Sequence, residues 1–290
     1  MNKLLKRSAS GLVYVGAIVG AIFAGNLWFA LLCMVFAAIG IHEFQNATTD
    51  SSEKATTLGR IINAGDIVIV LLALSLSYSW TDIRVPGVMI DICGIALIVL
   101  LLAKPIVTLY DKRATALRHL AFSVLSLIYI LVPLLSLHQL YASPGSAVCL
   151  GEGVGAYLVL TLFILIWLND TGAYCVGSLI GKRRLFERLS PKKSWEGFFG
   201  GLGFSSLGSW LCFSYLGTLP QMELGAIGSI AIGAAIAIAA TWGDLFESLI
   251  KRTAGIKDSG TLIPGHGGVL DRIDSLLIAA PWMVIIVSLI

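Results

Sequence analysis

Residues 157–168 read YLVLTLFILIWL, and the run ends at Asn169, Asp170 and Thr171. With its flanking residues, this predominantly apolar stretch is long enough to cross the roughly 30 Å hydrocarbon core of a bilayer as a helix. The whole chain has the same character, because 57% of its residues are hydrophobic and 13% are charged. An average soluble domain is about 25% charged. We therefore expect an all-α, polytopic integral membrane protein.

Nine apolar stretches are candidate membrane spans. They lie near residues 11–25, 27–41, 65–79, 86–103, 120–140, 154–174, 197–217, 224–243 and 275–290. Eight or ten spans are alternatives, because the second and third stretches are short. Several stretches are rich in Gly, Ala and Ser, which allows helices to approach closely in lipid. The first stretch follows Lys3, Lys6 and Arg7, and we expect it to be a retained signal-anchor.

Lysine and arginine are distributed unevenly over the expected loops. If the N-terminus is cytoplasmic, every basic residue except Arg84 falls in a cytoplasmic segment, among them Lys104 after the fourth span. A bias of this kind is a strong positive-inside signal. It predicts a cytoplasmic N-terminus and, for nine spans, a C-terminus outside.

Few side chains with evident chemistry lie in residues 1–150, which we interpret as an N-terminal transmembrane scaffold of about five helices and a candidate oligomer interface. Glu43 lies at the end of the second expected span. Asp66 and Asp91 lie near the starts of the third and fourth, where a carboxylate can accept hydrogen bonds from free backbone N–H groups. His138 has no partner at metal-ligand spacing, and we expect it to be interfacial or hydrogen-bonded within the bundle.

Residues 151–290 differ, and we interpret them as a C-terminal catalytic transmembrane region. Asp170 lies close to the hydrocarbon, where an ionisable side chain is costly and usually faces a polar cavity. Tyr174 is four residues further on and would share its helix face. A structural hydrogen bond between helices is the alternative for Asp170.

The densest basic stretch is GKRRLFERLSPKKSWEG, residues 181–197. It is either a positive-inside loop that contacts anionic headgroups or a cradle for a triphosphate and a lipid phosphate. Its second half contains a turn proline, the adjacent cations Lys192 and Lys193, and Trp195 at the expected membrane boundary. Charge alone does not decide between the two interpretations.

The segment richest in polar residues is GDLFESLIKRTAGIKDSGTLIPGHGGVLDRIDS, residues 243–275. On a helix, Asp244, Ser248 and Lys251 would fall on one face. Asp271 and Asp274 are three residues apart at the start of the last span and would point the same way. Three carboxylates from two helix ends suit Mg²⁺, which prefers oxygen ligands.

Cations and glycines accompany these carboxylates. Lys251, Arg252 and Arg272 would neutralise phosphate charge, and the glycines around His266 would allow close backbone approach to a ligand. The alternatives are a solvated loop between helices and an ion-coupled transporter. Transporters, however, usually place their charged side chains near the membrane midplane, whereas these lie at the ends of late spans.

Several blocks of this region resemble the signature of phosphatidate cytidylyltransferases of the bacterial type. They are SLIKR at 248–252, KDSG at 257–260, PGHGGVLDRID at 264–274, DTGAY at 170–174 and SPKKSWEG at 190–197. The resemblance is specific over residues 165–290, and in the first half it is limited to a similar run of spans.

The resemblance implies a homodimeric, all-helical enzyme of the bacterial inner membrane, with its site in a polar cavity open to the cytoplasm. Such an enzyme converts CTP and phosphatidic acid to CDP-diacylglycerol and pyrophosphate in phospholipid biosynthesis. Mg²⁺ is the implied cofactor, a second monovalent or divalent cation stays open, and nucleic acid is not an implied partner. By similarity, Asp244, Asp271 and Asp274 would bind the metal, while Ser248 and Lys251 would line the phosphate site.

We accordingly expect three groups of site residues. Catalytic roles are expected for Lys251, Asp271, Arg272 and His266, with ordering of the glycine-rich turn as the alternative for His266. Substrate binding is expected for Asp170, Lys192, Lys193, Ser248, Arg252 and Lys257. A CTP-dependent lipid-alcohol kinase and a transporter are rival functions. A CDP-alcohol phosphotransferase is disfavoured because its DG…AR…G…D…D pattern does not occur in the sequence.

Overall fold

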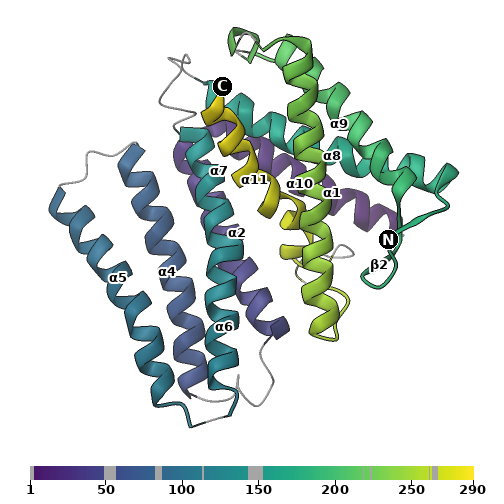
Figure 1. The fold of residues 1–290 in the computed structure, drawn as a ribbon. Coiled ribbons are helices and arrows are strands. Elements are labelled where there is room, and N and C mark those ends of the chain that lie inside the picture. The colour runs from purple at the N-terminus through teal and green to yellow at the C-terminus, as the bar shows by residue number, and fades with distance from the viewer. Residues whose placement is uncertain are drawn as a thin grey trace. The chain divides into compact units, whose positions relative to one another are not determined.

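The computed structural model describes residues 3–48, 57–81, 87–112, 114–142, 153–217, 219–222, 224–260, 262 and 267–290. Most of these residues are helical, and one two-stranded hairpin interrupts the helices (Figure 1). The elements are α1 (Lys3–Ala24), α2 (Asn26–Thr48), α4 (Thr57–Thr81), α5 (Gly87–Leu109), α6 (Ala116–Ser126), η1 (Leu127–Leu131), α7 (Val132–Ala142), α8 (Val154–Ile180), β1 (Arg184–Phe186), β2 (Ser190–Ser194), α9 (Trp195–Tyr215), η2 (Leu219–Met222), α10 (Ala226–Thr253) and α11 (Leu270–Leu289).

Helices long and apolar enough to cross a membrane confirm the polytopic fold. Seven occur in the part of the chain that the structure describes: Asn26–Thr48, Gly59–Tyr78, Ile92–Leu109, Ala116–Ala142, Val154–Ile180, Ala226–Thr253 and Leu270–Leu289. The other two expected stretches are helical as well: α1 has a shorter apolar segment, Ser10–Ala24, and α9 covers most of 197–217. The chain is thus an all-α multi-pass membrane protein, and nine spans with a cytoplasmic N-terminus stay a prediction.

Two compact units make up the chain. Unit 1 contains residues 1–138 and 254–272, and unit 2 contains residues 139–253 and 273–290. The segment 254–272 of the expected catalytic region therefore folds with the first helices of the chain, whereas the division at residue 150 into scaffold and catalytic region stays a prediction.

A buried polar network joins four helices of unit 1. The fully buried Asp66 of α4 accepts hydrogen bonds from Gln45 Nε2 at 2.8 Å and Ser123 Oγ at 2.7 Å. Lys104 of α5, also buried, forms an ion pair with the same carboxylate. Buried charges need such partners. The expectation that Asp66 caps a helix is wrong, since α4 begins more than two turns earlier; the Asp91 side chain lies outside the described residues.

Two other features of unit 1 correct or confirm the sequence interpretation. Lys104, expected in a cytoplasmic segment, lies inside the apolar helix α5 because Asp66 supplies its countercharge. His138 is fully buried, and its ring nitrogens contact Ser77 Oγ at 2.8 Å and Asn26 Oδ1 at 3.0 Å. The expectation of a histidine satisfied within the bundle is confirmed.

In unit 2, α8, α9 and α10 pack against one another through small residues. A Cβ atom at Gly197 of α9 would lie 2.8 Å from the carbonyl oxygen of Ala173 in α8. A Cβ atom at Gly233 of α10 would lie 2.6 Å from the Cα of Ser206 in α9. Both distances are too short for a side chain, so the expected close approach of helices at small residues is confirmed.

Candidate functional site

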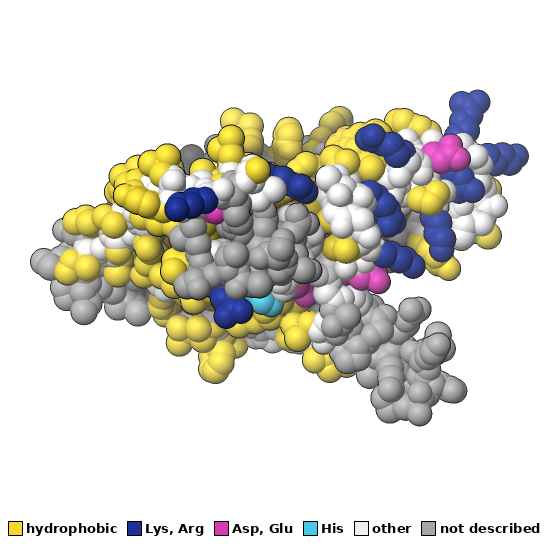
Figure 2. Space-filling model, turned by 90° about the horizontal axis from the view of Figure 1, so that it is seen from below, with side chains coloured by type: hydrophobic (Ala, Val, Ile, Leu, Met, Phe, Trp, Pro, Cys, Tyr) yellow, Lys and Arg dark blue, Asp and Glu magenta, His cyan; other side chains and the backbone are white. Residues whose placement is uncertain are grey.

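The basic stretch after α8 folds into a hairpin that displays its cations. Strands β1 and β2 pair antiparallel, with Arg184 opposite Ser194. The exposed side chains along this stretch include Lys182, Arg183, Arg184, Arg188 and Lys192. Figure 2 shows Lys and Arg side chains gathered over one part of the face that it draws, while hydrophobic side chains cover much of the rest.

Local hydrogen bonds hold the hairpin in place at the start of α9. Ser194 is the N-cap of α9, and its Oγ accepts from Gly197 N at 3.2 Å. The Glu196 carboxylate accepts from Lys182 N at 3.1 Å and Arg183 N at 3.2 Å. Hydrogen bonds from its own amide and from these two amides, together with the charge of Arg183, hold the pKa of Glu196 below its ordinary value. The SPKKSWEG block is therefore an ordered element that fixes two lysines relative to α9.

Three carboxylates converge where α10 and α11 lie close together. Gly243 allows this approach, because a Cβ atom there would lie 2.7 Å from the carbonyl oxygen of Asp274. Asp244, Glu247 and Asp274 each offer a carboxylate oxygen within 4.8 Å of the others. Glu247 is fully buried and the two aspartates are half-buried. A set of oxygen donors this close fits a hard divalent cation such as Mg²⁺.

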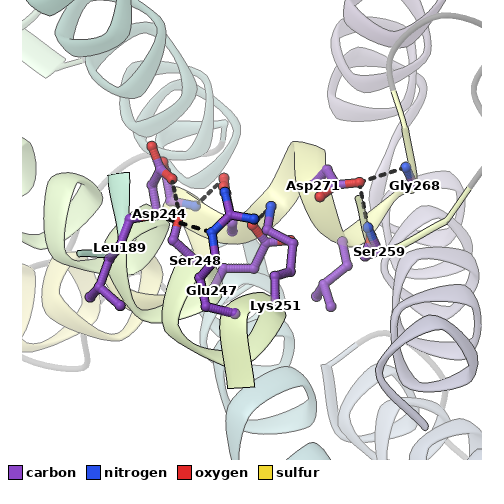
Figure 3. Close-up of polar contacts among 12 residues, drawn as sticks. Leu189, Asp244, Glu247, Ser248, Lys251, Ser259, Gly268 and Asp271 are labelled. Carbon is purple, nitrogen blue, oxygen red and sulfur yellow. Dashed lines mark hydrogen bonds and ion pairs between the residues drawn. The ribbon is translucent and has the colours of Figure 1, made fainter. Parts of the chain in front are cut away.

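Two lysines balance part of this negative charge. Lys193 Nζ, from the hairpin, lies 2.5 Å from Asp244 Oδ2. Lys251 forms an ion pair with Glu247 one turn earlier on α10. Ser248 Oγ donates to Asp244 Oδ1 at 3.4 Å, so the predicted polar face of α10 is present in the structure (Figure 3).

A cavity of about 500 Å³ adjoins this cluster within unit 2. Its polar lining comes from α8, the hairpin and α10: Asn169, Asp170, Tyr174, Ser178, Arg184, Lys192, Lys193, Ser194, Thr241 and Asp244. Asp170 and Tyr174 both line it, as expected for two residues on one helix face. The volume lies within the 300–1,000 Å³ typical of small-molecule sites. Polar groups from three elements thus face one space that a nucleotide-sized ligand would fit.

Asp271, which belongs to unit 1, has a different set of contacts. Its Oδ2 accepts from Gly268 N at 2.8 Å and from Ser259 N at 3.0 Å (Figure 3). The carboxylate therefore reaches back from the first turn of α11 to the loop before it. This is the hydrogen-bonding pattern of a residue that closes a helix N-terminus.

The remaining predicted residues divide between the units. Arg252 in unit 2 contacts the carbonyl oxygen of Leu189 on the hairpin through Nε at 3.5 Å. Lys257 and Arg272 are exposed residues of unit 1, and His266 lies outside the described residues. The roles expected for Lys257, Asp271, Arg272 and His266 stay predictions.

Glu247 is the member of the acidic cluster that sequence reasoning missed. It is three residues after Asp244 and four before Lys251, so helical spacing alone places it on their face. The signal was present in the sequence.

Comparisons with known proteins indicate the family to which this chain belongs. A profile of the cytidylyltransferase family matches residues 5–290. Over 277 residues, 96% of each chain, the protein is 28% identical to a phosphatidate cytidylyltransferase of Staphylococcus saprophyticus. Over 128 residues, 44% of each chain, it is 44% identical to a phosphatidate cytidylyltransferase of Haemophilus influenzae.

A protein of the same name from Pseudomonas aeruginosa is 44% identical over 124 residues, which are 43% of this chain and 45% of that protein. The stronger identity is therefore confined to less than half of these two relatives, and the weaker one extends almost from end to end. Since the family profile covers nearly all of the sequence, this chain belongs to the cytidylyltransferase family.

Proposed function

We propose that this chain is a phosphatidate cytidylyltransferase, which joins CTP to phosphatidic acid and releases CDP-diacylglycerol and pyrophosphate. One observation carries the proposal: a single cavity is lined by cations of an ordered hairpin and by Asp244, which belongs to the carboxylate cluster. Membership of the cytidylyltransferase family makes the chain a nucleotidyltransferase, and the names of its relatives supply the lipid substrate.

The reaction requires attack of a phosphatidate oxygen on the α-phosphorus of CTP. A new P–O bond forms as the bond from the α-phosphorus to the β-bridging oxygen breaks, and pyrophosphate leaves with that electron pair. A phosphate monoester carries about −1.5 to −2 charges near pH 7, so the nucleophile is already an anion. The barrier is then mainly repulsion between two anions, which fixed positive charges lower.

The residues of unit 2 meet this need in two ways. Arg184, Lys192 and Lys193 line the cavity and would bind the triphosphate. Lys193 lines the cavity and also forms an ion pair with Asp244. We propose that its ammonium group moves from this carboxylate to a phosphate oxygen when CTP binds.

The acidic cluster would hold Mg²⁺ through Asp244, Glu247 and Asp274. When bound, this ion would neutralise phosphate charge and orient the α-phosphate. Lys251 beside Glu247 limits the excess of negative charge in the cluster. Asp271 stays a proposed ligand on the resemblance of its motif alone.

Localisation and assembly are part of the proposal. Exposed cations on the hairpin favour a cytoplasmic position for the cavity in a bacterial inner membrane. CTP is a cytosolic nucleotide, so a cavity on that side would have access to it. A homodimer is proposed on the family resemblance.

Transfer of α-labelled CTP to lipid tests the function. Protein purified in detergent should place label in the lipid phase with phosphatidic acid, CTP and Mg²⁺, and release one pyrophosphate for each CDP-lipid. Transfer of γ-label to a lipid alcohol, without α-label in lipid, would identify a kinase instead. If a folded protein gives neither product, the proposal is wrong.

A further inference from the structure

We propose that Glu43, at the end of α2, is a positioning residue that holds the first turn of α11 and thereby Asp271. The inference deepens the proposed function and rests on it, because the importance of that turn lies in the metal-binding role predicted for Asp271. Glu43 itself need not touch substrate or metal. It lies in unit 1 together with the loop that it binds, residues 254–269.

The Glu43 carboxylate is buried and fully engaged by distant parts of the sequence. Its side chain is 6% exposed. Oε1 accepts from Val269 N at 3.1 Å, and Oε2 accepts from Leu270 N at 2.8 Å. Oε2 also accepts from Ser259 Oγ at 3.1 Å. A single carboxylate of α2 thus binds two separate points, Ser259 and the 269–270 backbone, more than 200 residues away in the sequence.

These contacts supply a helix cap from another helix. The first backbone N–H groups of a helix have no partner within it, and a Ser, Thr, Asp or Asn at the cap position usually accepts one of them. The residue just before α11 is Val269, whose side chain accepts no hydrogen bond. Glu43 takes over this function, and its negative charge also suits the positive end of the helix dipole.

The loop backbone is shaped around this carboxylate. A Cβ atom at Gly268 would collide with Glu43 Oε2 and with Ser259 Oγ, and a Cβ atom at Gly260 would collide with Glu43 Oε1. Both positions therefore admit only glycine as long as Glu43 stays where it is. Contact with Glu43, a residue of the N-terminal half, therefore accounts for the need for glycine at positions 260 and 268 without a bound ligand.

Ser259 connects Glu43 to Asp271. Its hydroxyl donates to Glu43, while its backbone N–H donates to Asp271 Oδ2 at 3.0 Å. Gly268, packed against Glu43, donates its own N–H to the same Asp271 oxygen at 2.8 Å. Displacement of the Glu43 carboxylate would move both donors that orient Asp271.

The test compares Glu43→Gln with the wild type in the α-label assay across a Mg²⁺ titration. Gln keeps the size of the side chain but replaces one acceptor oxygen with an NH₂ group that faces a backbone donor. We expect kcat to fall about 10- to 100-fold, as is typical when partners of metal ligands are lost. The Mg²⁺ concentration for half-maximal rate should rise, and the KM for CTP should change little. Glu43→Asp, which keeps the charge, should recover part of the rate. His42→Gln, an exposed change on the same turn of α2, is the matched control and should match the wild type.

Hydrogen exchange of the detergent-solubilised protein gives a readout independent of turnover. In Glu43→Gln the amides of residues 268–271 should exchange faster, while those of α8 should be unchanged. A folded Glu43→Gln protein with wild-type exchange, kcat and Mg²⁺ dependence would overturn the inference. If wild-type protein itself makes no CDP-lipid, the proposed function fails, and the exchange data still decide whether Glu43 holds the turn.

A second variant covers the case in which Glu43→Gln does not fold. Ser259→Ala removes one donor to the carboxylate and leaves the backbone intact. It should shift exchange and Mg²⁺ dependence in the same direction by a smaller factor. Wild-type behaviour of Ser259→Ala in both measurements would then count against the inference.

Discussion

Replacement of Asp244 by Asn tests the acidic cluster most directly. The change removes one of three carboxylates whose oxygens lie within 4.8 Å of one another and keeps the shape of the side chain. Gly243 and the α10 backbone are untouched, so the approach of α11 should be preserved. The expected result is a loss of turnover with retention of fold.

The size of the loss follows from the geometry. Two unit charges 4 Å apart interact by about 4 kcal/mol at an effective dielectric constant of about 20, so a dication near one carboxylate gains about 8 kcal/mol. Two features reduce this value: the Asp244 side chain is 31% exposed, and in the wild type the ion must compete with Lys193 at 2.5 Å. We therefore expect about 3–4 kcal/mol of lost stabilisation, which corresponds to roughly 100- to 1,000-fold in kcat/KM.

The assay is the initial rate of α-label transfer to lipid, measured from low to saturating Mg²⁺ with the folded state checked by thermal unfolding. Glu187→Gln is the matched control, because it makes the same chemical change at an exposed acidic residue of the hairpin. Its rate should equal that of the wild type. A folded Asp244→Asn enzyme within about tenfold of wild type, or about 1.4 kcal/mol, would refute the cluster as the metal site.

Three further predictions concern stability and order. Glu247→Gln removes the countercharge of the mostly buried Lys251 and should destabilise the protein by about 3 kcal/mol in thermal unfolding. The double variant Glu247→Gln with Lys251→Met should recover most of that stability. Equal destabilisation of the single and the double variant would contradict the ion pair. Lys104→Met should destabilise the protein by a similar amount, about 3 kcal/mol, and the additional change Asp66→Asn should restore stability. Turnover per folded molecule should be unchanged in both variants. A selective loss of turnover would show that the polar network around Asp66 has a role in the reaction. Glu196→Gln should speed tryptic cleavage after Arg183 and Arg184. Hydrogen bonds lower the Glu196 pKa in the folded state, so the stabilising effect of this carboxylate is full above its unfolded-state pKa and is lost as pH falls through the lowered value. Cleavage of Glu196→Gln at the same rate as Glu187→Gln would contradict the role of Glu196 in holding the hairpin.

Local patterns were sufficient to predict the membrane helices and one face of the site. Long apolar runs predict spans because lipid leaves the backbone few alternatives to a helix. The spacing of Asp244, Ser248 and Lys251 predicted their shared face, since it depends only on helical periodicity. The contact of Gly243 with α11 could not be predicted from the sequence, yet this glycine allows Asp274 of α11 to approach Asp244.

Pairings between distant elements could not be predicted in the same way. Asp66 was interpreted as a helix cap because its position near the start of an apolar run was the only local signal, while its partner Lys104 is 38 residues further along the chain. Glu43 was likewise interpreted only as the end of a span, because its position after an apolar run was its only local signal and its partners are more than 200 residues away. The hairpin within an all-α chain was also missed, because Pro191 and the charges around it indicated a loop; proline is tolerated at the edge of a two-stranded sheet.

The charge balance of unit 2 supports the proposal that a divalent cation binds at the acidic cluster. The cations Arg184, Lys192, Lys193 and Lys251 lie in the cavity wall or against the cluster, together with the carboxylates Asp170, Asp244, Glu247 and Asp274. These side chains nearly cancel, so they alone leave little positive charge for a triphosphate and a phosphate monoester of about −1.5 to −2 charges. Cations placed directly against carboxylates, as Lys193 and Lys251 are, suit a site that stays neutral until substrate arrives together with its metal. An enzyme that relied on lysine and arginine alone would have no use for three convergent carboxylates, since each would repel the phosphates that the cations attract.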